Sequence, residues 1–337
     1  MKKHYIEMDK LRGIAICMVL LYHSIIVFPI NLHEIVWCST LHFLLWKIEM
    51  PLFFLVSGFC AFCGKQYGSY LKKKVQRILV PHIVFGLLDI VPRIISNPFV
   101  NEQMSIEKAI QDFLLYGGSD WFLWTLFLLF LFFPVLERVY ATGPAGKIIL
   151  LIESFILYFV SDYVTGVFLL NLVAEFQIYF VMGYIVRQEI YEKQKEVCLR
   201  SISVLVAGMV LMVFLPILGW VEGKNIGMLL FVIAGGVVFL WLAEKSNGMI
   251  GRFFCICGRY SLQMYLLGGY ALVASRTLLV SILEVDNPYL IIGGNFVLDL
   301  ILTISVTHFM IRPNRWICIL CGLPWNPASN VKRELWL

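Results

Sequence analysis

Charged residues are scarce in this sequence. Only 15% of the 337 residues are charged, whereas 60% are hydrophobic and the mean hydropathy is +0.83. Soluble domains usually contain about 25% charged and 45–50% apolar residues. A soluble fold of this length could not bury so much apolar surface. The composition therefore excludes an ordinary soluble protein and predicts an integral membrane protein.

Several signatures of other protein classes are also missing. No basic stripe with interleaved aromatics accompanies the net charge of +5, so we expect no nucleic-acid partner. Cys318 and Cys321 have zinc-like spacing, but no second pair lies nearby, so we expect no metal. No small-residue cleavage site follows the first apolar run, which is long enough to span. Without repeats or a soluble segment, residues 1–337 are predicted to form one transmembrane domain.

Apolar segments of about 20 residues, the length that crosses a bilayer, recur along the chain. They predict an all-α polytopic bundle of about ten transmembrane helices. Most of the 27 lysines and arginines fall on alternate loops, on the side of the N-terminus, so we expect a multi-pass protein of the cell (plasma) membrane with both termini cytoplasmic. The expected spans are 11–30, 41–63, 78–96, 121–140, 147–161, 166–187, 200–218, 226–243, 260–281 and 288–311.

The longest loop on the other side covers residues 97–120. Within it, residues 105–116 alternate like a short helix at the membrane interface. Ser105 is suited to cap the start of this helix, and Gly117 and Gly118 are suited to end it.

Ionisable residues inside spans are rare and mark functional or paired groups. Arg12 and His23 are eleven residues apart, which on an α-helix brings them within about 20° of one face and about 16 Å apart along the axis. Alternatively, Arg12 is a topology anchor and His23 a hydrogen-bonded core residue. Asp9 could cap the helix or pair with Arg12. The strongest candidates within spans are Arg12, His23, Glu49, Glu175, Asp299 and His308.

A basic run precedes the third span in the stretch KKKVQRILVPH. It could anchor the topology near anionic headgroups or hold a phosphate-rich cytoplasmic ligand. Lys74 and Arg77 are three residues apart, a spacing that places two side chains on one face of an α-helix. The cations of this run are Lys72, Lys73, Lys74 and Arg77.

The second span contains Pro51, and a break near that residue is expected because proline removes a helical hydrogen bond. Ser57 and Gly58 permit either a close helix approach or a break. Glu49 lies beside the expected break. Glu175 lies deep in the sixth span, where a lone carboxylate needs a partner, and the sequence leaves open His23, Arg12 or Lys47, or a structural hydrogen bond.

Six stretches stand in order along nearly the whole chain. They are MDKLRGIAICMVLLYH, EMPLFFLVSGF, KKKVQRILVPH, DWFLWTLFLL, FQIYFVMGYIVRQ and GRYSLQMYLL. Trp121 belongs to the fourth stretch and Tyr265 to the last. Each is weak alone in hydrophobic sequence, but together and in this order they resemble signatures of the membrane acyltransferase-3 family.

Three positions depart from the family pattern. Glu49 stands where relatives commonly have histidine, and Gly268 where they often have histidine. Lys74 replaces a usual arginine, which loses bidentate geometry at a phosphate. The first two changes could alter the acceptor, the donor or the handling of protons, and the third argues against a fixed bidentate contact with phosphate.

The resemblance implies an O-acyltransferase that moves an acyl group, first of all acetyl from acetyl-CoA, to a hydroxyl of an envelope or exopolysaccharide sugar. His23 is then the general base, Arg12 and the basic run hold the donor's phosphates, and Glu175 orients His23 or receives its proton. Asp9, Glu49, Ser57, Trp121 and Tyr265 are expected in supporting positions. Membrane lipid and a carbohydrate or lipid-linked sugar acceptor are the expected partners, and the oligomeric state is open.

A second interpretation is transport without covalent chemistry. A bundle with buried histidine and carboxylate side chains also suits a proton-coupled exporter of glycan intermediates. The lack of an inverted repeat disfavours it. A sensor or scaffold is a third and weaker alternative.

Overall fold

The structure is a computed structural model that describes residues 4–63, 66–96, 105–192 and 202–325. Within these ranges the regular secondary structure is helical throughout and includes no strand. The chain divides into two compact units, each described here by itself. Unit 1 comprises the described parts of 1–56 and 194–314, and unit 2 those of 57–193 and 315–325.

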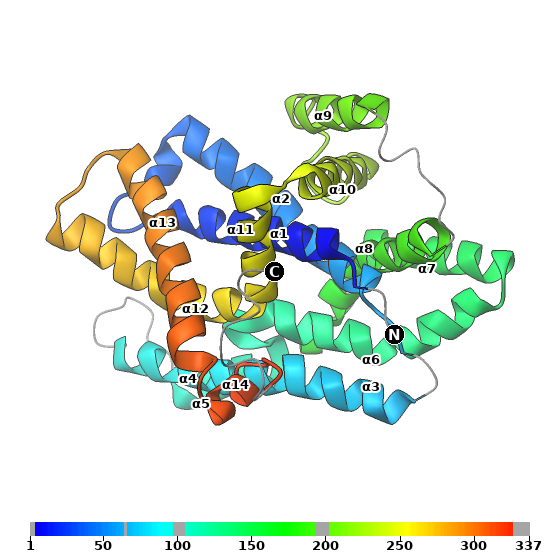
Figure 1. Ribbon diagram of the computed structural model, residues 1–337, viewed down its shortest axis with the longest axis horizontal. Coiled ribbons are helices and arrows are strands. Elements are labelled where there is room, and N and C mark those ends of the chain that lie inside the picture. The colour runs from blue at the N-terminus through cyan, green and yellow to red at the C-terminus, as the bar shows by residue number, and fades with distance from the viewer. Residues whose placement is uncertain (1–3, 64–65, 97–104, 193–201, 326–337) are drawn as a thin grey trace. The chain divides into compact units, whose positions relative to one another are not determined.

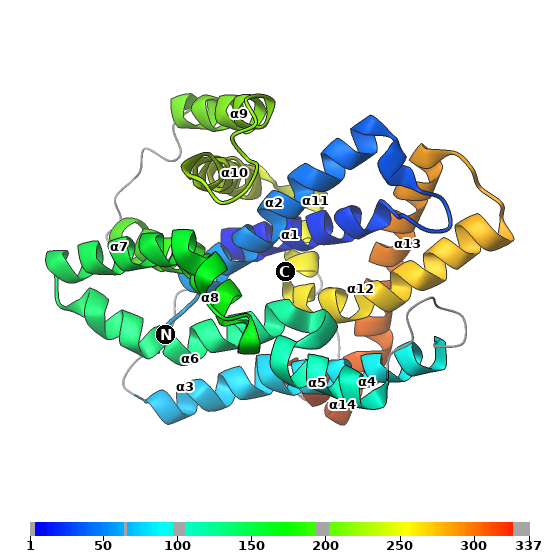
Figure 2. The same ribbon diagram turned by 180° about the vertical axis from the view of Figure 1, so that it is seen from behind.

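Unit 1 is built around its first helix. The helix α1 (Ile6–Ser24) packs against α10 (Ile226–Lys245), α11 (Gly248–Arg259), α12 (Ser261–Arg276) and α13 (Pro288–Val306) (Figure 1). The helices α9 and α10 lie side by side in both views (Figures 1 and 2). Its remaining elements are η1 (Leu32–Glu34), α2 (Val36–Phe59), whose last three residues belong to unit 2, α9 (Ile202–Ile217), η9 (Thr277–Ile282) and η10 (Thr307–Ile311).

Two glycines bring the backbones of α1 and α11 into direct contact. A Cβ atom on Gly13 would lie 2.0 Å from the carbonyl oxygen of Phe254, and one on Gly258 would lie 1.8 Å from that of Asp9. No side chain fits at such distances, so glycine is required at both positions. Small residues at helix contacts allow this approach, as in membrane helix pairs.

Unit 2 contains the middle of the chain. Its helix α6 (Trp121–Ala141) packs against α3 (Tyr67–Lys74), α7 (Pro144–Val160) and α8 (Leu170–Val186), and α7 pairs with α8 (Figure 2). A π turn, η2 (Val75–Leu79), joins α3 to α4 (Val80–Ser96). The other elements are α5 (Ile106–Tyr116), η4 (Gly118–Asp120), η5 (Ser161–Tyr163), η6 (Val167–Leu169), η7 (Arg187–Tyr191) and α14 (Arg315–Leu320).

The predicted helical membrane architecture is confirmed in its coarse form. Each of the ten expected spans falls on a helix, and seven helical segments of the described chain are long and apolar enough to cross a membrane. The helices α1, α4 and α9 are not among those seven. The number ten and the cytoplasmic termini therefore remain predictions.

The short helix expected in the long loop is confirmed with both of its ends. The helix α5 begins after Ser105, whose hydroxyl accepts a hydrogen bond of 3.1 Å from the backbone N–H of Lys108. It ends at Gly117, which has the left-handed backbone (φ +70°) typical of a helix C-cap. Loop residues 97–104 lie outside the described residues.

Two boundaries differ from the expectation. The helix α2 continues through Pro51 to Phe59, so the predicted break is wrong. Proline removes one hydrogen bond, but the contacts of a buried helix can hold the remaining turns together. The first helix ends at Ser24, although the apolar run continues to residue 30, because hydrophobicity alone does not determine where a helix stops.

Candidate functional site

The arginine of α1 is held by its neighbouring acid. The distance from Arg12 Nη1 to Asp9 Oδ1 is 3.8 Å, and His4 Nε2 lies 2.9 Å from Asp9 Oδ2. The helix starts at Ile6 with Tyr5 as its N-cap, so Asp9 pairs with the arginine and does not cap the helix. The Arg12 side chain keeps 28% of its surface exposed and can still meet a ligand.

His23 occupies the last turn of α1, and its side chain is exposed. The helix is continuous from Ile6 to Ser24, so the eleven-residue spacing does bring His23 to the same face as Arg12. An exposed imidazole and a partly exposed guanidinium therefore lie about 16 Å apart along one face. The catalytic roles predicted for them stay predictions.

A chain of ring contacts next to His23 was missed from the sequence. Tyr22 contacts His23 edge-on, with ring centroids 4.8 Å apart, and stacks on His42 at 4.0 Å. His42 in turn meets His33 at 4.2 Å. Three of the chain's six histidines thus gather around the end of α1. The residue types were visible in the sequence, but only the turn after α1 brings them together.

The other predicted residues of unit 1 lie on α2 and α12. Glu49 is buried, with 2% of its surface exposed, and its Oε2 has no hydrogen-bond partner in the described part of the chain. Tyr265 is half-buried on α12. Lys47, a suggested partner for Glu175, lies over the rings of Trp46 and Phe43, with Nζ 4.8 and 5.2 Å from their centroids.

In unit 2, the basic run is divided between solvent and the protein interior. Lys72, Lys73 and Arg77 are exposed. Lys74 is half-buried, and its Nζ lies 3.2 Å from the ring centroid of Phe130 and 5.6 Å from that of Tyr70. The chain after Lys74 is a π turn, which is wider than an α turn, so the three-residue spacing does not give Lys74 and Arg77 the same surroundings.

Tyr70 holds the beginning of this basic run against α6. Its hydroxyl donates a 3.1 Å hydrogen bond to the carbonyl oxygen of Phe130, and burial raises the pKa of the phenol above its usual value. The hydroxyl therefore stays protonated and remains a donor. Tyr70 and Lys74 together join the end of α3 to Phe130 of α6.

Trp121 and Glu175 belong to one neighbourhood of unit 2. Trp121 begins α6 and stacks on Phe176, with ring centroids 5.8 Å apart. Phe176 follows Glu175 on α8, and Glu175 itself is half-buried. Its suggested partners His23, Arg12 and Lys47 belong to unit 1, so a pairing with any of them remains a prediction.

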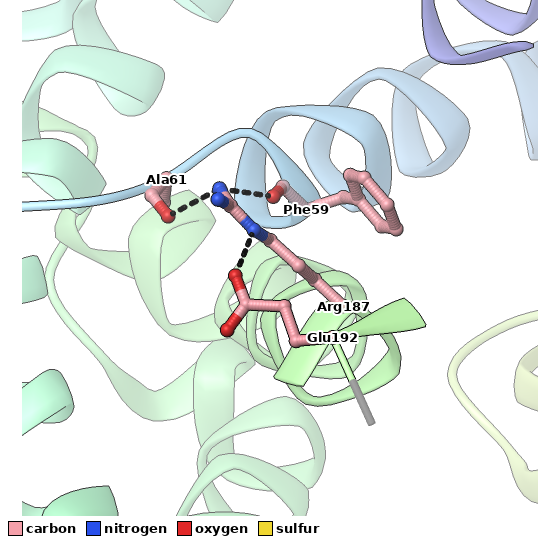
Figure 3. A network of polar contacts seen from close by, with 4 residues as sticks. All are labelled: Phe59, Ala61, Arg187 and Glu192. Carbon is pink, nitrogen blue, oxygen red and sulfur yellow. Dashed lines mark hydrogen bonds and ion pairs between the residues drawn. The ribbon is translucent and has the colours of Figure 1, made fainter. Parts of the chain in front are cut away.

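A polar network holds the end of α2 within unit 2. Ser57 is half-buried there, and a Cβ atom on Gly58 would lie 1.8 Å from the carbonyl oxygen of Phe180, which confirms the predicted close approach. Arg187 donates from Nη1 to the carbonyl oxygens of Phe59 and Ala61 at 3.3 and 3.4 Å (Figure 3).

The same arginine is itself paired. Its Nε donates to Glu192 Oε1 at 2.9 Å (Figure 3). The last carbonyls of a helix have no partner within it, and a cation there is favourable. Sequence reasoning treated Arg187 only as a topology charge, because more than 120 residues separate it from these carbonyls.

Metal-ligand chemistry is weakly represented. Among residues 4–63, 66–96, 105–192 and 202–325, no group of three or more histidine, cysteine or acidic side chains is arranged to hold a metal ion. The groups available for chemistry are therefore an exposed imidazole, partly exposed cations and two deep carboxylates, Glu49 and Asp299.

Comparison with protein families gives one match. A family model described as an acyltransferase domain matches residues 5–322. The chain belongs to the acyltransferase-3 family. This membrane acyltransferase is thus a transferase acting on groups other than amino-acyl groups. No curated protein and no solved structure matches it.

Family membership agrees with the resemblance of the six stretches. The match covers both units, so neither is an addition to the family domain. It gives the reaction class of this acyltransferase, and leaves the donor, the acceptor and the residue roles to be argued from the side chains.

Proposed function

We propose that this protein is an O-acyltransferase that uses cytoplasmic acyl-CoA, in the first instance acetyl-CoA. The acceptor is a hydroxyl of an envelope or exopolysaccharide sugar, polymeric or lipid-linked. The observation that carries the proposal is the exposed imidazole of His23 on the same face of α1 as Arg12. Membership of an acyltransferase family supports the reaction class.

The reaction needs a base because a sugar hydroxyl is a poor nucleophile at neutral pH. His23 takes the hydroxyl proton while the hydroxyl oxygen forms a bond to the thioester carbonyl carbon. The carbon–sulfur bond then breaks, and the proton passes to the departing thiolate to give free CoA. Atoms and charges balance without a further reactant, so one imidazole can serve both proton transfers.

The donor's phosphates need cations. Arg12, Lys72, Lys73 and Arg77 offer guanidinium and ammonium groups with exposed surface, and charge-assisted hydrogen bonds to phosphate are strong. The ammonium of Lys74 lies against the ring of Phe130, so we assign it a smaller part in donor binding.

The roles of the remaining residues are proposed from the sequence. Glu175 is the proposed group that orients His23 or receives its proton. The proposed supporting residues are Asp9, Glu49, Ser57, Trp121 and Tyr265, and Asp9 has the clearest basis because it pairs with Arg12. We further propose that the protein resides in the cell membrane with both termini cytoplasmic.

The decisive experiment uses the purified full chain with acetyl-CoA labelled in the acetyl group. Label should move to a lipid-linked or oligomeric glycan acceptor and stay there as an alkali-labile ester. His23→Ala should stop this transfer. Transfer at the wild-type rate by that variant would contradict the role of His23. Gradient-driven flux of unmodified glycan without label transfer would instead support the exporter.

A further inference from the structure

The second half of α13 and the first residue of η10 carry a polar stripe on one face, although α13 is apolar and packs against α1 and α12. Four polar side chains recur at intervals of four residues, and such side chains share a helix face. Each of them has 0% of its surface exposed. They are Asn295, Asp299, Thr303 and Thr307.

The two threonines are satisfied by their own helix. The Thr303 hydroxyl donates to the carbonyl oxygen of Asp299 at 2.7 Å, and the Thr307 hydroxyl donates to that of Thr303 at 2.7 Å. Such bonds to the preceding turn are ordinary for threonine in helices. This half of the stripe needs no other partner.

The other half is different. Both carboxylate oxygens of Asp299 and both side-chain polar atoms of Asn295 lack a hydrogen-bond partner among the residues that the structure describes. A buried polar atom left unpaired costs about 1–3 kcal/mol, and a charged one costs more. Four such atoms on adjacent helical turns are therefore open to water or to a guest that the protein itself does not supply.

A glycine of α12, Gly268, lies beside Asp299. A Cβ atom on Gly268 would lie 3.9 Å from Asp299 Oδ2 and 3.0 Å from Cδ2 of Leu20 on α1. The carboxylate therefore faces the junction of α1, α12 and α13 at a position where α12 has no side chain. Any guest there touches α1 one turn before His23.

The charge of the guest follows from that of the site. Ion pairs between described residues include those of Asp9 with Arg12, Lys147 with Glu189 and Arg187 with Glu192, and Asp299 is in none of these pairs. An ionisable residue in a membrane helix usually marks a functional site and pairs with another group. A buried carboxyl group is neutralised either by a proton or by a bound cation, and its ionised form needs a compensating charge that water does not provide.

We propose that Asp299 and Asn295 form a binding site for a monovalent alkali cation, with sodium as the probe. The Asp299 carboxylate and the Asn295 Oδ1 are hard oxygen ligands, which such cations prefer. One carboxylate neutralises one monovalent charge, whereas a divalent ion would leave a net charge in an apolar bundle. The Asn295 amide N–H groups stay free to donate to Asp299 or to a water on the ion. The site does not depend on the proposed acyl transfer.

The test is sodium binding by the purified full chain in detergent. Radioactive sodium binding and thermal unfolding are measured in sodium, potassium and choline chloride at equal ionic strength. We expect saturable sodium binding and a higher Tm in sodium than in choline. Asp299→Asn should weaken binding at least tenfold and remove the sodium dependence of Tm, and Asn295→Val should weaken binding to a smaller extent.

Two glycine variants form a matched pair. Gly268→Ala keeps the carboxylate but narrows the space, so sodium binding should weaken, whereas Gly269→Ala has no atom within 4 Å of the added Cβ and should bind as the wild type does. The proposal is overturned if the wild type binds no sodium saturably. Equal binding by wild type, Asp299→Asn and Gly268→Ala also overturns it. If Asp299→Asn does not fold, the glycine pair and the wild type still decide.

Discussion

Two polar sites, one in each unit, differ in how their groups are paired. In unit 2, Arg187 donates to two carbonyl oxygens and to Glu192, so its charge is used within the protein. In unit 1, Asp299 and Asn295 are fully buried and find no hydrogen-bond partner in the described chain, and the imidazole of His23 is exposed. Satisfied groups hold a fold together, whereas unsatisfied ones are available to a ligand.

This difference separates two consequences of mutation. Removing an available group of unit 1 should cost activity or ligand binding while the protein keeps its stability. Removing a satisfied group of unit 2 should cost stability while each folded molecule keeps its activity. The following variants test that separation.

The largest effect is expected for His23→Ala. A positioned general base contributes about 10²- to 10⁴-fold to a rate, so acyl transfer should fall by that factor. The Tm should stay within about 2 °C of wild type because the side chain is exposed. The control is His33→Gln, a half-buried histidine of the same ring cluster. Equal losses of activity in both variants would contradict a special role for His23.

Arg187→Ala should give the largest loss of stability among these variants. It removes two hydrogen bonds to carbonyl oxygens and one to Glu192, at a cost of about 1–3 kcal/mol in the free energy of unfolding. Thermal melts measure this loss, with the exposed Arg252→Ala as control. An unchanged Tm together with a loss of activity would mean that Arg187 serves the reaction and not the stability of the fold.

Arg77→Gln and Lys74→Met separate the two kinds of cation within unit 2. Exposed Arg77 is proposed to meet donor phosphate, so its loss should raise the apparent KM for acetyl-CoA about tenfold, which is about 1.4 kcal/mol. Lys74→Met keeps a contact with Phe130 and should change that KM by less than about threefold. Steady-state kinetics at varied acetyl-CoA measure both. A larger rise for Lys74→Met would reverse the assignment.

The smallest effect is expected for Glu49→Gln. The amide has nearly the same shape and carries no charge, and the Oε2 of Glu49 has no hydrogen-bond partner in the described structure. The free energy of unfolding should therefore change by less than about 1 kcal/mol, in the stabilising direction if the carboxylate is ionised. Chemical denaturation measures it. A loss above about 2 kcal/mol would mean that Glu49 takes part in a satisfied network.

Local sequence signals predicted local structure well. The start of α5 after Ser105 and its end at Gly117 follow from a capping hydroxyl and from a left-handed glycine, which need no distant partner. Gly58 was correctly expected at a close approach. The break at Pro51 was wrong, because continuity of α2 depends on its packing and not on its own sequence.

The candidate site was less accessible to sequence reasoning. The shared face of Arg12 and His23 needs only a regular helix, and that geometry is present. The stacking of Tyr22 on His42 depends on how the chain turns after α1, and the contact of Lys74 with Phe130 joins residues 56 positions apart. No local sequence signal predicts either contact. The presence of basic and aromatic residues in a stretch therefore does not show which of its cations can reach a ligand.

The two glycine contacts between α1 and α11 also limit how the enzyme can move. Gly13 meets Phe254 and Gly258 meets Asp9, so the contacts are four residues apart on each helix and run in opposite directions. If α1 slid by a single residue, a side chain would collide with a carbonyl group. The helix that carries His23 can therefore tilt against α11 but cannot slide along it.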